Sequence, residues 1–107
     1  MLDPATTAVL SEAQIDQTVS AIASVQLPSG CIPYWEGGPA DPWDHVEAAM
    51  ALTAGGRYDP AENAFRWLAN TQRPDGAWAS EYRDDVATEQ TLDANFCSYL
   101  AVGLWHY

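Results

Sequence analysis

Two segments of the chain repeat one pattern 46 positions apart, and this repeat constrains the fold more than any other feature. In each segment an apolar helical stretch ends in a Gln, which is followed by a Pro and then a Gly. The residues are Gln26, Pro28 and Gly30 in the first copy, and Gln72, Pro74 and Gly76 in the second. A helical repeat of this length is typical of stacked helical hairpins, because each hairpin buries its apolar face against a neighbour.

The pattern of caps and breaks predicts four helices and an all-α fold. The first spans about 11–25, where Ser11 and Gln14 form a capping box. The second begins at Asp41-Pro42 and stops at Gly55-Gly56, the third runs from Asp59-Pro60 to Gln72, and the fourth covers about 91–105. Segments 27–41 and 73–89 are expected to be loops, with no strand. Gly30 and Gly76 are expected to have positive φ.

Composition restricts the class of protein. The chain has 107 residues, 48% of them hydrophobic, and 15 acidic residues against four basic ones, with a formal net charge of -11. This charge disfavours nucleic acid and anionic membranes as partners. Cys31 and Cys97 are far apart in sequence, and no stretch approaches the ~18 apolar residues that span a bilayer. We therefore expect a cytoplasmic protein without a disulfide or a membrane span.

The second repeat also resembles a known motif. Trp67-Leu68, then Gln72, then Gly76-x-Trp78 is similar to the QW motif of the terpenoid cyclase and protein prenyltransferase superfamily, of which squalene-hopene cyclases are typical members. In the first repeat Ile32 stands in place of the Trp, and Trp35 is a candidate substitute. The resemblance implies an α/α-toroid, in which Gln26, Gly30, Gln72, Gly76 and Trp78 have structural roles.

The same resemblance bears on domain organisation. Residues 1–107 are expected to form a single partial toroid domain, with repeat 1 over about 11–56 and repeat 2 over about 57–107. A toroid closes its ring with more hairpins than two. The chain is therefore expected either to be an N-terminal piece of a longer toroid or to form a homo-oligomer.

Polar residues at the starts of the second and fourth helices are the candidates for chemistry. Aligning the repeats places Asp44 opposite Asp93, and in a toroid these helix starts would line the mouth of the cavity. The predicted catalytic residues, acting as general acid and base, are Asp44, His45, Glu47 and Asp93. Trp35, Trp43 and Asn95 are predicted to bind substrate. The alternative is that Asp44 and Asp93 are only helix caps or first-turn carboxylates.

The motifs for a defined reaction are incomplete. The Asp-x-Asp-Asp acid motif of the cyclases is absent, because Tyr82 precedes Arg83-Asp84-Asp85, and this acidic pair is expected in a surface loop. The zinc-binding Asp-x-Cys pair of the prenyltransferases is replaced by Asp93-x-Asn95. We therefore predict no metal and no cofactor.

Three functions remain open at this point. The leading one, implied by the resemblance, is a prenyltransferase- or cyclase-like protein that binds a small, partly apolar isoprenoid. The second is a carbohydrate-active or sugar-binding toroid, because the loop Tyr34–Gly38 places aromatic rings beside acidic residues and glycoside hydrolases use paired carboxylates. The third is a non-catalytic helical-repeat fragment that oligomerises.

Overall fold

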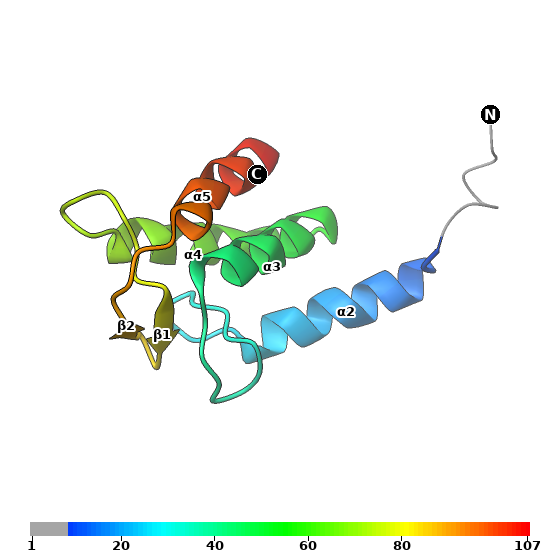
Figure 1. Cartoon of the computed structure of the whole chain (residues 1–107). Coiled ribbons are helices and arrows are strands. Elements are labelled where there is room, and N and C mark those ends of the chain that lie inside the picture. The colour runs from blue at the N-terminus through cyan, green and yellow to red at the C-terminus, as the bar shows by residue number, and fades with distance from the viewer. Residues whose placement is uncertain (1–8) are drawn as a thin grey trace.

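The computed structural model describes residues 9–107, and it is mostly helical (Figure 1). In chain order the elements are α2 (Glu12–Val25), α3 (Pro42–Ala54), α4 (Tyr58–Thr71), β1 (Glu81–Arg83), β2 (Val86–Glu89) and α5 (Ala94–His106). The all-α class predicted from the sequence is confirmed. The first eight residues of the predicted 1–107 domain lie outside the described part. No helix within residues 9–107 is long and apolar enough to cross a membrane.

Among the helices that lie within residues 9–107, side-chain caps define three of the four starts. The capping box of Ser11 and Gln14 begins α2, as predicted. Asp41 caps α3, with Pro42 as the first helical residue. Asp93 caps α5, so this helix begins about three residues later than the predicted position 91. These carboxylates accept hydrogen bonds from amides that have no partner within the helix.

The start of α4 differs from the prediction. Asp59 was expected to be its cap, but the helix begins one residue earlier, at Tyr58, and the N-cap is Arg57 without a side-chain cap hydrogen bond. Asp59 instead lies in the first helical turn, where a carboxylate interacts favourably with the helix dipole.

A small β-hairpin replaces part of the predicted loop 73–89. Strands β1 and β2 pair antiparallel through a turn at Asp84 and Asp85, whose φ values are 48° and 65°. Positive φ at both central residues is typical of the two-residue turn that suits a hairpin, and Asp tolerates it. The expectation of no strand was wrong, because strands of three and four residues are too short to show an alternating pattern in the sequence.

The hairpin is attached to the segment that leads into α3. Ala40 and Tyr82 exchange two backbone hydrogen bonds, of 2.9 and 2.8 Å. Asp85 accepts hydrogen bonds from the hydroxyl of Ser29, at 2.7 Å, and from the indole Nε1 of Trp67, at 3.0 Å. The hairpin therefore holds together the turn at Gly30, helix α4 and the start of α3.

The core lies where α3 packs against both α4 and α5, while α2 extends away from this group (Figure 1). Val46, Ala49 and Leu52 of α3 are fully buried. Gly103 allows α5 to approach closely, because a Cβ there would lie 2.3 Å from the side chain of Val46. Helix α3 is therefore the central element, and it carries the candidate site.

The sequence repeat is also a structural repeat. The side-chain Nε2 of Gln26 donates to the carbonyl of Gly30 at 3.0 Å, and Gln72 donates to the carbonyl of Gly76 at 2.9 Å. Both glycines have positive φ, +102° and +85°, as predicted. The indole Nε1 of Trp78 donates to the carbonyl of Leu68 at 2.8 Å near the end of α4. These bonds close a turn and join it to its helix. The role of the repeated residues is therefore structural.

Candidate functional site

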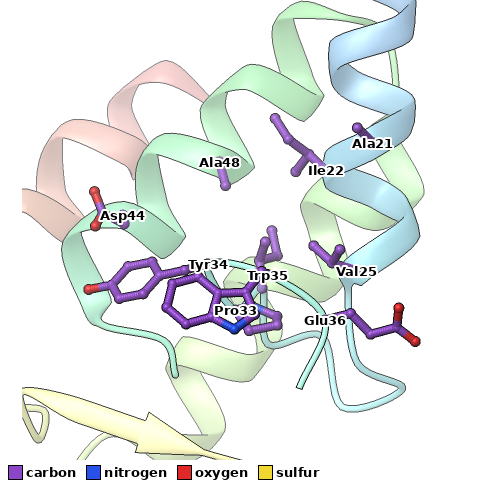
Figure 2. A pocket seen from close by; sticks show the side chains of 10 residues that line it. Ala21, Ile22, Val25, Pro33, Tyr34, Trp35, Glu36, Asp44 and Ala48 are labelled. Atoms are coloured by element: carbon purple, nitrogen blue, oxygen red, sulfur yellow. The ribbon is translucent and has the colours of Figure 1, made fainter. Parts of the chain in front are cut away.

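A pocket of ≈ 380 Å³ lies between α2, α3 and the segment that follows the first Gly turn (Figure 2). Its apolar lining comes from both helices and from the start of this segment. The residues that line it are Ala21, Ile22, Val25, Ile32, Pro33, Tyr34, Trp35, Glu36, Asp44 and Ala48. The pocket thus has apolar walls, two aromatic rings and two carboxylates.

Tyr34 and Trp35 form the aromatic wall, and Figure 2 shows their rings next to each other. The ring centroids are 5.9 Å apart with an interplanar angle of 37°. Trp35 is 60% exposed although it is a large apolar residue. Its indole lies over Gly38, where a Cβ would come within 2.7 Å of the ring. Gly38 therefore allows the indole to lie flat against the loop with much of its surface open to solvent.

Asp44 supplies a carboxylate to the pocket from the first turn of α3. Its backbone N–H donates to Oδ1 of Asp41 at 2.8 Å, and the hydroxyl of Tyr34 donates to Oδ2 of the same Asp41. Partial burial, followed by the charges of Asp41 and Glu47, raises the pKa of Asp44 above its ordinary value, while the nearby hydroxyl of Tyr34 acts in the opposite direction. Asp44 therefore retains its proton to a higher pH than a free carboxyl group does.

Asp41 differs from Asp44 because it is buried and both of its oxygens have partners. It caps α3, receives the Tyr34 hydroxyl and lies beside Asp44. Burial and the neighbouring Asp41 together raise the pKa of Tyr34, so its phenol remains protonated and continues to donate. Asp41 thus fixes the position of one aromatic ring and of one carboxylate of the pocket.

His45 is fully buried beneath the pocket rather than in it. Its Nδ1 accepts from the N–H of Ile32 at 3.0 Å, so its Nε2 carries the proton and donates to the carbonyl of Ala64 at 2.9 Å. Burial lowers the pKa of His45 to about 4. The neutral ring links Ile32, which belongs to the segment that lines the pocket, to α4. It has no access to a ligand.

Trp43 and Glu47 belong to a neighbouring cluster between α3 and α5. The indole Nε1 of Trp43 donates to Oε1 of Glu47 at 2.8 Å. The Trp43 ring lies 5.1 Å from Tyr99 and meets Phe96 edge-on at 6.1 Å. These residues join the two helices near their N-termini and do not line the pocket. Of the predicted substrate-binding residues, only Trp35 does.

Asp93 and Asn95 lie at the start of α5. Oδ1 of Asp93 accepts from the backbone N–H groups of Asn95 and Phe96, at 2.9 and 3.1 Å, as a helix cap does. Because Asp41 and Asp93 are the two caps, they are the equivalent residues of the repeats. The predicted alignment of Asp44 with Asp93 was therefore wrong by three positions.

The structure brings Asp44 and Trp35 to one pocket, together with residues that were not among the predicted site residues. Tyr34 and Glu36 are the additions to the lining, and the buried Asp41 holds Tyr34 from the cap of α3. The signal for them was the aromatic and acidic segment 34–41, since exposed aromatic rings next to carboxylates are typical of sugar sites rather than of a packed core.

Comparison with known proteins finds a relative that is named as a glycosidase. The chain is 51% identical, over 104 residues, to the "MMP endo-(1,4)-3-O-methyl-alpha-D-mannosidase" of Mycolicibacterium hassiacum. The matched residues make up 97% of this chain and 29% of that relative, so the chain spans less than a third of the relative's length. No protein-family model matches the chain.

This relative overturns the resemblance drawn from the QW-like motif. A glycosidase name at 51% identity contradicts membership of the terpenoid cyclase and prenyltransferase superfamily, and with it the transferase and isoprenoid assignments. The physical reason is that Gln72, Gly76 and Trp78 only close a turn and join it to α4. Such contacts stabilise helical repeats and carry no information about a reaction.

Proposed function

We propose that this chain contributes a sugar-binding pocket to a glycoside hydrolase whose substrate is a partly methylated, α-1,4-linked mannoside. The likeness to the Mycolicibacterium hassiacum mannosidase supports this substrate class. The single observation that carries the proposal is that Trp35 and Asp44 line one pocket whose remaining walls are mainly apolar.

The pocket suits a sugar that carries O-methyl groups. The exposed face of Trp35 offers a flat apolar surface for the C–H face of a pyranose ring. Ile22, Val25 and Ile32 supply an apolar wall. An O-methyl group lacks the donor of a free hydroxyl, so it enters such a wall without leaving an unpaired polar hydrogen. The same wall disfavours a free hydroxyl at that position.

Asp44 is the proposed general acid. Glycoside hydrolysis requires a carboxylic acid, usually one with a raised pKa, that protonates the leaving oxygen. Asp44 is exposed to the pocket and its pKa is raised by burial and by its acidic neighbours. Asp41 and Tyr34 are positioning residues, since their hydrogen bonds hold the start of α3 and the aromatic wall together.

Glu36 is a second carboxylate of the same pocket. Figure 2 shows its side chain at the opposite end of the pocket from Asp44. A sugar bound between them would contact a carboxyl group at each end. In this account Glu36 accepts hydrogen bonds from sugar hydroxyl groups and so orients the ring.

Calorimetric titration tests this proposal. The ligands are an α-1,4-linked oligosaccharide of 3-O-methylmannose and its unmethylated counterpart. We expect the methylated ligand to bind more tightly, and Trp35→Ala to weaken its binding by about fivefold, because one ring-stacking contact contributes about 1 kcal/mol. Tyr58→Ala is the matched control, because Tyr58 is an exposed aromatic residue that does not line the pocket.

Two results would overturn the proposal. One is equal affinity for the two oligosaccharides in the unmodified protein. The other is a Trp35→Ala protein that binds the methylated ligand as tightly as the Tyr58→Ala control. Where hydrolysis of the ligand is measurable, Asp44→Asn is expected to abolish it and to leave binding within a few-fold, because the amide keeps the shape of the carboxyl group and loses its acidic proton.

A further inference from the structure

The first repeat carries a surface that binds a helix, and α4 occupies it. Besides the bond to Gly30, Nε2 of Gln26 donates a second hydrogen bond, of 2.9 Å, to the carbonyl of Pro60 in the first turn of α4. Gly30 is pressed against the same helix, because a Cβ there would lie 2.1 Å from the carbonyl oxygen of Asn63. Ala49 and Leu52 of α3, which packs against α4, are fully buried.

The second repeat carries the same surface, and it is open. Within the described residues Nε2 of Gln72 has one acceptor, the carbonyl of Gly76, and its second hydrogen points to no acceptor. Around Gly76 a Cβ would meet only the Gln72 side chain, at 4.0 Å. When Asp41 is aligned with Asp93, Ala49 corresponds to Ala101 and Leu52 to Leu104. Ala101 is exposed and Leu104 is 55% exposed.

The open surface carries exposed apolar side chains. We call it the open α5 face and define it by Gln72, Gly76, Ala101, Leu104 and Trp105. Trp105 is 93% exposed, although an exposed Trp of this kind is rare on a monomeric surface. An apolar hollow of ≈ 260 Å³, lined by Leu68, Trp78, Leu100 and Leu104 among others, lies beside it.

We propose that the open α5 face binds a helical hairpin of the same repeat type, and that in solutions of this chain the first hairpin of a second copy occupies it. The repeat itself supplies the template, since α4 shows how such a helix is seated on this surface. The contact is head to tail, because it joins the end of one copy to the beginning of the next.

Helix α2 has the features that the template requires. When Gln26 is aligned with Gln72, Ile15 corresponds to Ala61, which is buried in α4. Ile15 is 42% exposed, and α2 extends away from the other helices (Figure 1). The residue equivalent to Pro60 is Gln14, whose carbonyl accepts from the hydroxyl of Thr18 at 2.8 Å, a bond that the free hydrogen of Gln72 would replace.

Such a contact uses two different patches, so each copy can bind one neighbour at each end. Association then continues until a ring closes. Because each copy has a formal net charge of -11, added salt is expected to strengthen the association by screening the repulsion.

Light scattering on two complementary variants tests the proposal. Leu104→Glu blocks the open α5 face and keeps α2 intact, whereas Ile15→Glu blocks α2 and keeps the face intact. We expect each variant alone to be monomeric and an equimolar mixture to form a dimer with one copy of each. Val86→Glu, at an exposed position of β2 in neither patch, is the control and is expected to associate like the unmodified chain.

Three results would overturn the proposal. The first is an unmodified chain that remains monomeric at high protein and salt concentrations. The second is a mixture of the two variants that remains monomeric. The third is unchanged association of either variant alone. Circular dichroism of each variant shows whether it is folded, and dimer formation in the mixture requires that both are.

Discussion

The Nδ1 atom of His45 accepts a hydrogen bond from the backbone N–H of Ile32, 3.0 Å away, and this bond fixes the pocket segment to α3. Its other nitrogen donates to Ala64 of α4, so one buried ring joins three parts of the chain. In the second repeat the equivalent of His45 is Cys97, whose Sγ lies 3.9 Å from the carbonyl of Trp78. The His45 link thus belongs to the repeat that carries the pocket.

This geometry predicts a loss of stability in acid. The pKa of His45 is lowered from 6.5 to about 4 by burial, so between these values the unfolded chain binds the proton first. The stabilisation that neutral His45 contributes to the folded state is fully present above pH 6.5. It is lost progressively as the pH decreases to about 4. We expect the free energy of unfolding to drop by about 3 kcal/mol over this range, measured by urea titration. A His45→Gln chain with the same slope in that window would contradict this assignment.

The two repeat glycines are expected to respond differently to one substitution. Both Gly30→Ala and Gly76→Ala place a side chain at positive φ, which costs about 1 kcal/mol. Only Gly30→Ala also forces a Cβ against the carbonyl of Asn63. We therefore expect Gly30→Ala to cost about 3 kcal/mol or more in thermal or urea unfolding. Equal losses for the two variants would mean that α4 is not seated on Gly30 as described.

Asp85 is expected to matter more than its neighbour Asp84. Both have positive φ, so an Ala substitution strains the backbone similarly at each. Asp85→Ala additionally leaves the buried indole N–H of Trp67 without its acceptor. This should cost about 1–3 kcal/mol beyond the effect of Asp84→Ala in the free energy of unfolding. A larger loss for Asp84→Ala would contradict the attachment of the hairpin to α4.

The pKa of Asp44 should respond to its neighbours in opposite directions. Carbon-detected NMR titration is expected to give a pKa above that of a free Asp side chain. Glu47→Gln removes a negative charge that disfavours ionisation, so it should lower the pKa of Asp44. Tyr34→Phe removes a nearby hydroxyl that favours the ionised form of Asp44, so it should raise the pKa of Asp44. Shifts of the opposite sign would exclude Asp44 as a proton donor tuned in this way.

Local signals predicted much of the helical frame. Ser11 with Gln14 and Asp41 with Pro42 mark two helix starts because caps act over three or four residues. The Gln and Gly of each repeat also predicted the shared turn. The β-hairpin escaped prediction because its pairing is held partly by Ala40, which is distant in sequence from Tyr82.

The candidate site was only partly predictable, because it also depends on contacts between segments that are distant in sequence. Asp44 and Trp35 were recognised as single residues, but the pocket that they share depends on how α2 meets α3. His45 was predicted to be catalytic, and its location under Ile32 depends on the position of α4. The QW-like motif suggested a wrong family because the residues that stabilise a repeat do not specify its chemistry.

Methyl-detected NMR during titration with the 3-O-methylmannose oligosaccharide tests the central claim most directly. The account predicts that the methyl signals of Ile22, Val25 and Ile32 shift together and saturate at one affinity, with much smaller shifts for the unmethylated oligosaccharide. The methyl signals of Leu100 and Leu104, which line the other hollow, should remain unchanged. Shifts at these two leucines, or equal shifts with both ligands, would contradict the assignment of a methylated-sugar site between α2 and α3.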